Sequence, residues 1–212
     1  IYNRTDTLIN NYLCGSKTGI PVKMAAQEDL ISALVRDGSL DREGYTLLLE
    51  DPDHGVTSRL AERAREVAQA VFGNGIYIRG LIELTNYCRN DCYYCGIRRS
   101  NANAVRYRLT KEQVMECCRL GNELGFRTFV LQGGEDGYYT DAILEDIVRS
   151  IKKEFPDNAI TLSLVERGRD SFQKLYDAGA DCYLLRHETA DEKYYNVLHP
   201  VRMSYRAPIK AL

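Results

Sequence analysis

Residues 80–95 decide how this chain is interpreted, and they read Gly80-Leu81-Ile82-Glu83-Leu84-Thr85-Asn86-Tyr87-Cys88-Arg89-Asn90-Asp91-Cys92-Tyr93-Tyr94-Cys95. An apolar segment typical of a strand runs into a loop in which Cys88, Cys92 and Cys95 follow C-x₃-C-x₂-C spacing. Three thiolates on one short loop can bind three irons of a [4Fe–4S] cube. Because no fourth cysteine is near, the fourth iron would have no protein ligand. That iron could then be chelated by the amino and carboxylate groups of a substrate or cofactor.

Two other uses of the cysteines compete with this hypothesis. A structural zinc site needs four ligands, and the later candidates, Cys182 and His187, do not stand in a paired spacing. Disulfides fit poorly with an odd count of seven cysteines and no secretory signal. The iron–sulfur interpretation is therefore favoured over zinc, and zinc over disulfides.

The composition is that of a soluble globular protein. The 212 residues carry a net charge of −2 and are 44% hydrophobic, with a pI near 6.0. We therefore expect no nucleic-acid partner, no membrane span and a reducing, cytoplasmic location. The chain begins with Ile1 and stops a few residues into an expected helix, so we expect it to be part of a longer protein.

Two regions are expected. Residues 1–75 form a helical N-terminal segment, with helices in 24–35, after Asp41 as N-cap, and from about 57 to 71. Residues 76–212 alternate strands with helices, and the expected strands are 81–85, 126–132, 159–164 and 182–185. Thr110-x-x-Gln113 predicts a capping box, and Thr189-x-x-Glu192 predicts another helix start.

Repeated βα units imply an α/β fold with a parallel sheet and right-handed crossovers. About four units are visible, which predicts an incomplete βα barrel of the TIM type. Functional groups of such barrels gather at the C-terminal ends of the strands. In the helix after Thr110 the expected buried stripe includes Cys117, Cys118 and Leu124.

Four sequence blocks resemble those of a known family. The cysteine loop, with Tyr94 as its aromatic, matches the C-x₃-C-x-aromatic-C loop of radical S-adenosylmethionine (SAM) enzymes. Residues 79–83, 94–99, 131–136 and 183–189 together resemble the HydE-type maturase of [FeFe]-hydrogenase, a relative of biotin synthase. The resemblance spans roughly residues 24–206.

The resemblance implies an enzyme with one [4Fe–4S] cluster and one SAM in a barrel of six to eight βα units. Reductive cleavage of SAM would yield methionine and a 5′-deoxyadenosyl radical. The radical would act on a small iron-containing precursor during assembly of the hydrogenase H-cluster. A ferredoxin or flavodoxin would supply the electron.

The same resemblance assigns roles to groups at the strand ends. Gly133-Gly134-Glu135 resembles the motif that faces the amino group of SAM, and its glycines would let the backbone approach that ligand closely, with no Cβ in the way. Gly-Gly is also common in ordinary turns. Glu166 could accept hydrogen bonds from the SAM ribose, and Arg186 could bind its carboxylate. A salt bridge between Glu166 and Arg186 is the structural alternative, but the adjacent Leu184 and Leu185 should bury the base of Arg186 and favour the ligand role.

The remaining residues carry weaker expectations. His187 and Glu188 are candidates for lining a substrate cavity, and His199 is expected to be structural. The arginines at 98, 99, 106 and 108 form either a solvated face or a counter-charge to the thiolates. The rival functions are another enzyme of the same group, of the biotin synthase or methylornithine synthase type, and a non-enzymatic metal-binding module.

Overall fold

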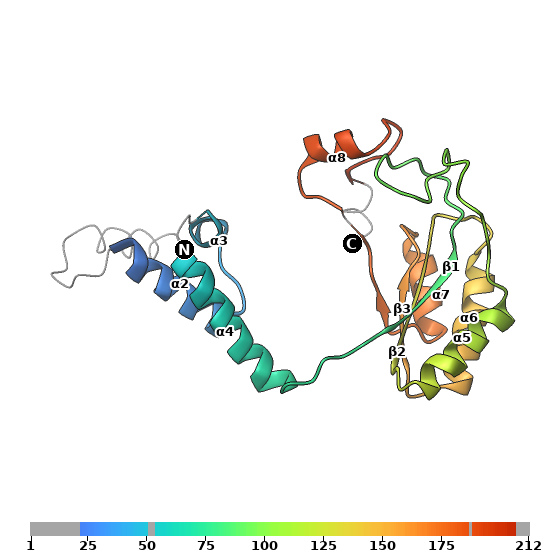
Figure 1. The fold of residues 1–212 in the computed structure, drawn as a ribbon, viewed down its shortest axis with the longest axis horizontal. Coiled ribbons are helices and arrows are strands. Elements are labelled where there is room, and N and C mark those ends of the chain that lie inside the picture. Colours follow the sequence, from blue (N-terminus) through green and yellow to red (C-terminus); the bar gives the residue numbers. More distant parts are fainter. Residues whose placement is uncertain (1–21, 51–53, 187, 207–212) are drawn as a thin grey trace. The chain divides into compact units, whose positions relative to one another are not determined.

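The computed structural model describes residues 22–50, 54–186 and 188–206 of the chain. The chain divides into two compact units, Ile1–Ile76 and Tyr77–Leu212. Figure 1 shows a group of helices in the first unit and a sheet with its helices in the second.

The first unit contains α2 (Val22–Asp37), α3 (Arg42–Leu49) and α4 (His54–Phe72). Its small core consists of Ile31, Leu48 and Val56. Asp41 is the N-cap of α3, as predicted, and its carboxylate accepts a hydrogen bond of 2.7 Å from the Gly44 amide. The apolar stripe expected along α4 is not buried within this unit beyond Leu60, since residues 61–71 are exposed there.

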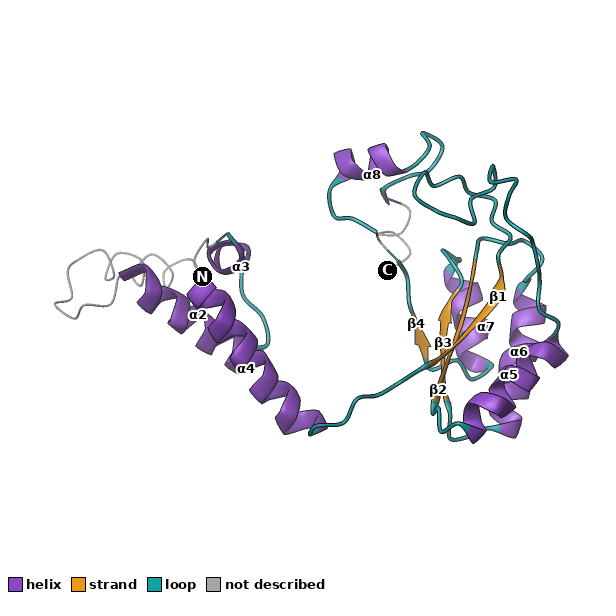
Figure 2. Cartoon of the chain, in the orientation of Figure 1, coloured by secondary structure: helices purple, strands orange, loops and turns teal. Residues whose placement is uncertain are grey.

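The second unit is built on four parallel strands in the order β1-β2-β3-β4. The strands are β1 (Gly80–Thr85), β2 (Thr128–Gly133), β3 (Ala159–Ser163) and β4 (Cys182–Tyr183). The helices are α5 (Lys111–Glu123), α6 (Asp141–Glu154), α7 (Arg169–Asp177) and α8 (Glu192–Leu198). The predicted α/β fold with four βα units is thus confirmed, although β4 is shorter than expected (Figure 2).

Alternation along the strands decides which face of the sheet the helices cover. Every second strand residue belongs to one core shared with α5, α6 and α7, and these strand residues are Ile82, Leu84, Phe129, Leu131, Ile160 and Leu162. The intervening residues point to the other face, where Glu83 is exposed and Thr161 and Ser163 are buried. Helices packed on one face leave the C-terminal strand ends free to carry loops.

The helix boundaries follow local signals with two corrections. The capping box of Thr110 and Gln113 is present at α5, but α8 is capped by Asp191 rather than Thr189. In α5 the buried positions are Val114, Met115, Cys118 and Gly121. Cys117 and Leu124 are exposed, so the predicted stripe was wrong at these two positions.

Candidate functional site

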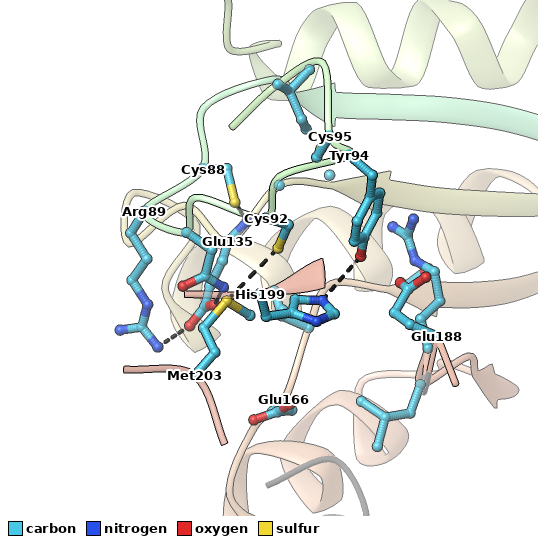
Figure 3. Close-up of a pocket in the computed structure, with 18 of the residues that line it drawn as sticks. Cys88, Arg89, Cys92, Tyr94, Cys95, Glu135, Glu166, Glu188, His199 and Met203 are labelled. Carbon is cyan, nitrogen blue, oxygen red and sulfur yellow. Dashed lines mark hydrogen bonds and ion pairs between the residues drawn. The ribbon is translucent and has the colours of Figure 1, made fainter. Parts of the chain in front are cut away.

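A cavity of about 410 Å³ lies at the C-terminal edge of the sheet. Its walls come from the loop after β1, the ends of β2, β3 and β4, and the segment around the C-terminal end of α8 (Figure 3). Volumes of this size are typical of cofactor and substrate pockets. The predicted site residues that line it are Cys88, Cys92, Tyr94, Cys95, Gly133, Gly134, Glu135, Glu166, Arg186 and Glu188.

His187 lies outside the described residues, so the structure does not place it.

The loop after β1, residues 86–110, is held by its own polar side chains. The Asn86 side chain accepts from the Tyr107 amide at 2.8 Å and donates to the Val105 carbonyl at 2.6 Å. The Arg106 guanidinium donates to the carbonyls of Asn86, Ile97, Arg98 and Asn101. These bonds fold the loop back beside β1 and fix the cysteines at the strand end.

The arginines of this loop are therefore not a uniform solvated face. Arg108 forms a two-bond ion pair with Asp136, at 2.6 and 2.9 Å, and lies 4.0 Å from the centre of the Tyr87 ring. Arg98 donates to the Cys95 carbonyl at 3.1 Å. With Arg106 committed to backbone carbonyls, three of these four side chains organise the loop.

The turn after β2 touches the cysteine loop so closely that only glycine fits. A Cβ added to Gly134 would overlap the Tyr87 carbonyl oxygen and lie 2.9 Å from Cys88 Cβ. The Gly134 amide also donates to the Thr85 carbonyl at 3.2 Å. The close approach proposed for this glycine is thus made to the protein's own backbone.

Glu135 binds the cysteine loop through its backbone and its side chain. Its amide donates to Cys88 Sγ at 3.4 Å, and its carbonyl accepts from the Arg89 amide at 2.9 Å. Its carboxylate pairs with the Arg89 guanidinium (Figure 3) and also accepts a hydrogen bond from Asn90 Nδ2. The turn after β2 therefore holds the first half of the cysteine loop in register.

The charged residues after β3 and β4, Glu166 and Arg186, make fewer contacts than Glu135 does after β2. Burial against the cavity wall raises the pKa of the Glu166 carboxyl, and the Arg89 charge opposes that shift. Arg186 forms no ion pair with the described residues, and the salt bridge to Glu166 that was the structural alternative is not present among them. Leu184 is 50% exposed and Arg186 is exposed too, so the expectation that neighbouring leucines bury its base was wrong.

Two residues beside these charges have left-handed backbone angles. Val165 has φ 73° and Glu188 has φ 66°, a region that side chains other than glycine, asparagine and aspartate seldom occupy. Both residues line the cavity. Val165 directly precedes the candidate Glu166, and Glu188 is itself a candidate site residue. Such strain is concentrated at binding sites in many proteins.

The three cysteines of the loop after β1 are the ligand type that an iron–sulfur cluster requires. Cys88, Cys92 and Cys95 are free, partly buried thiols in one cavity. Among the described residues, no three histidine, cysteine, aspartate or glutamate side chains meet where a single ion would lie. A [4Fe–4S] cube binds each thiolate to a different iron, so its ligands need not converge.

Two further observations concern which cysteines could serve as metal ligands. Cys182, one candidate for a fourth zinc ligand, is exposed and lines a separate cavity with Phe172 and Leu185. Burial raises the pKa of the Cys88 and Cys92 thiols, so thiolates there need a bound cation or hydrogen-bond donors to offset the cost. The Glu135 amide already provides one such donor to Cys88.

Sequence reasoning missed several residues of this site. Asn90 and Arg89 bind Glu135, while His199 and Met203 reach the cysteine loop from beyond α8. His199 was expected to be structural, and it is 3% exposed and hydrogen bonded, yet it also lines the cavity. No local pattern marks these residues, because their partners are far away in the sequence.

Comparison with known proteins defines the class. The model of the radical SAM superfamily matches residues 82–212, more than half of the chain, so the chain belongs to that superfamily. Over 159 residues it is 45% identical to the [FeFe] hydrogenase maturase subunit HydE of Thermotoga maritima, covering 75% of this chain and 45% of that protein. The resemblance found in the sequence blocks is thereby confirmed.

Two further relatives point to the same group. The chain is 33% identical to 3-methylornithine synthase of Methanosarcina barkeri over 179 residues, which cover 77% of this chain and 50% of that protein. The crystal structure of methylornithine synthase (PylB) superposes with a TM-score of 0.73 at 28% identity, covering 86% of this chain and 54% of that one. The chain spans about half the length of the curated relatives it matches.

No described helix is both long enough and apolar enough to cross a membrane.

Proposed function

We propose that this chain carries the cofactor site of a radical SAM enzyme. Cys88, Cys92 and Cys95 would bind a [4Fe–4S] cluster whose fourth iron takes the amino and carboxylate groups of SAM. When bound, the cluster supplies the electron that cleaves SAM into methionine and a 5′-deoxyadenosyl radical. The chain's own side chains place the two cofactors and exclude water.

The protein groups have separate tasks in this proposal. Glu135 and the glycines before it, Gly133 and Gly134, would border the amino group of SAM, and Arg186 would pair with its carboxylate. Glu166 would accept from the ribose hydroxyls, and the Tyr94 ring would form one wall. Glu188, and His187 beside it, would face the substrate.

One observation carries the proposal. The three thiols of a single loop and the polar groups at three further strand ends line one cavity at one edge of the sheet. In a parallel sheet with helices on the outside, that edge is where functional groups gather. Arg186, which forms no ion pair with the described residues, and the partly desolvated Glu166 supply charges of both signs for a zwitterionic ligand.

For the parent protein we propose a role in maturation of [FeFe]-hydrogenase, which rests on the similarity to HydE. The substrate would be a small, cysteine-bound iron complex, and a ferredoxin or flavodoxin would deliver the electron. Both partners and the oxygen-sensitive cluster fit a cytoplasmic protein.

The test is anaerobic reconstitution with iron and sulfide, followed by reduction in the presence of SAM. We expect a [4Fe–4S] signal, and 5′-deoxyadenosine and methionine as products. Replacement of Cys88, Cys92 or Cys95 by alanine should abolish both, because two thiolates cannot hold the cube. Cys117→Ala is the matched control, since this exposed cysteine lies on the outer helix α5 and should leave the signal unchanged.

A normal cluster in the Cys88→Ala protein would overturn the assignment. Binding of zinc without iron and sulfide would instead support a non-enzymatic metal-binding module. Iron with sulfide but no SAM cleavage would leave a cluster protein without this activity.

A second candidate is supported by the similarity to 3-methylornithine synthase in both sequence and fold. The same reconstituted protein, supplied with amino acids and SAM, would then form 3-methylornithine, detected by mass spectrometry. Its formation would replace the hydrogenase role while leaving the proposed cofactor site intact.

A further inference from the structure

His199 lies just beyond α8 and is fixed on both sides of its ring. Its Nδ1 lies 2.9 Å from the Tyr195 carbonyl oxygen, and its Nε2 lies 3.3 Å from the Tyr94 hydroxyl. The ring stacks on Tyr195 at 3.9 Å between centroids and meets the Tyr94 ring edge to face at 5.4 Å. Only 3% of the residue is exposed.

The hydrogen bonds decide which nitrogen carries the proton. A carbonyl oxygen can only accept, so Nδ1 must donate to Tyr195. In the neutral imidazole Nε2 is then an acceptor, and the Tyr94 hydroxyl donates a hydrogen bond to it. The direction of the Tyr94 side chain is therefore set by a histidine 105 positions later in the chain.

Other contacts show that this part of the chain rests on the cysteine loop. The Tyr93 amide donates to the Leu198 carbonyl at 2.9 Å, and Met203 Sδ lies 3.7 Å from Cys92 Sγ. The Arg202 guanidinium donates to the Arg89 carbonyl at 3.0 Å. Within this contact, Met203 reaches the Cys92 thiol and His199 reaches the Tyr94 hydroxyl, and both of these side chains line the cavity (Figure 3).

We propose that His199 is a positioning residue, which holds the Tyr94 ring in the orientation that SAM binding requires. The inference rests on the proposed function. Tyr94 is 51% exposed, so packing alone leaves its ring free to turn. Fixing the ring before the ligand arrives removes part of the entropy cost of binding.

Two substitutions separate the two ends of the imidazole. His199→Gln places an amide near Nε2, where its oxygen can accept from Tyr94, whereas His199→Asn reaches only the position of Nδ1 and keeps the bond to Tyr195. Tyr94→Phe removes the hydroxyl and keeps the ring. Tyr93→Phe is the control, because Tyr93 is next to Tyr94 in the sequence but its ring is exposed and does not line the cavity.

The measurement is the dissociation constant of SAM for each reconstituted protein, with thermal unfolding recorded in parallel. We expect about fivefold weaker binding in His199→Asn and in Tyr94→Phe, and near-normal binding in His199→Gln and Tyr93→Phe. Because both losses remove the same hydrogen bond, the double variant His199→Asn/Tyr94→Phe should bind no more weakly than either single variant.

Unchanged affinity in Tyr94→Phe would overturn the inference, even if a His199 variant fails to fold. So would additive losses in the double variant, since they would show that His199 acts by another route. If the unsubstituted protein binds its cluster but no SAM, the proposed function fails instead.

Discussion

At the residue scale, the tightest constraint in the site is at Gly134. The sequence drew attention to this glycine as a place where backbone approaches a ligand. The structure shows that its neighbour is the cysteine loop itself, at Tyr87 and Cys88. Gly134 can contact the cysteine loop on one side and a ligand on the other, because a residue without Cβ allows close approach on both sides of its backbone.

Gly134→Ala should therefore displace the cysteine loop and reduce cluster loading. The added methyl group would overlap backbone atoms, which cannot rotate away as a flexible side chain can. We expect destabilisation of roughly 1–3 kcal/mol and a loss of most of the bound iron and sulfide, measured by chemical analysis after reconstitution. Gly137→Ala, three residues later in the same turn, should load normally because no atom lies within 4 Å of the added Cβ. Equal loading of both variants would refute the steric account.

At the scale of elements, Asp141 ties the start of α6 to the start of α7. Its carboxylate accepts from Ser171 Oγ at 2.6 Å and from the Arg167 guanidinium at 2.7 Å. Arg167 in turn donates to the Tyr139 carbonyl at 3.0 Å. The hydrogen bond from Ser171, followed by the Arg167 charge, holds the pKa of Asp141 below its usual value despite partial burial.

This shift fixes the sign of a pH effect. A carboxyl with a lowered folded-state pKa stabilises the protein above its unfolded pKa of about 3.9, and that contribution is lost as pH falls through the folded pKa. Asp141→Asn should lower the unfolding free energy by about 1 kcal/mol near neutral pH. The difference from the unsubstituted protein should shrink below about pH 4.

Denaturant unfolding at several pH values measures this difference. Asp170→Asn, an exposed position in the first turn of α7, is the control and should show little change at any pH. A difference that stays constant down to acid pH would show that Asp141 contributes through packing rather than charge.

Most elements could be predicted because their signals are local. The caps at Asp41 and Thr110 lie within three residues of the amides they bind. It is harder to predict which side chains of a helix are buried, because burial depends on what packs against the helix. On α5, Met115 rather than Cys117 faces the hydrophobic core. Helical spacing alone does not distinguish neighbouring positions at the edge of the buried stripe.

At the scale of the whole molecule, the two compact units are joined between Phe72 and Gly80, where no helix or strand is present. Phe72, Tyr77 and Leu81 are all more than half exposed. Unit boundaries of this kind are preferred sites of proteolytic cleavage.

We therefore expect chymotrypsin to cut first after Phe72 or Tyr77 under native conditions. Mass spectrometry of the early fragments identifies the site, and the variant Phe72→Ala/Tyr77→Ala should be cut much more slowly. First cleavage inside the sheet-bearing unit, for instance after Tyr139 or Phe155, would contradict the division into two units.

The candidate site shows the limit of prediction from sequence most clearly. Its cysteines share one loop, so their spacing alone suggested the chemistry. His199 and Asn90 carried no such signal, because their partners Tyr94 and Glu135 stand 105 and 45 positions away. Only the folded chain brings them together.

The way the cysteine loop is held also determines where its length can vary. Between Thr85 and Asn90, contacts to Gly134 and Glu135 fix almost every residue, so an inserted residue would break the register of the whole segment. Beyond Gly96 the loop closes mainly around the Arg106 side chain, and Ala102 and Asn103 are exposed. We therefore expect this protein to tolerate an inserted or deleted residue near 102–103, whereas the first half of the loop must keep its number of residues.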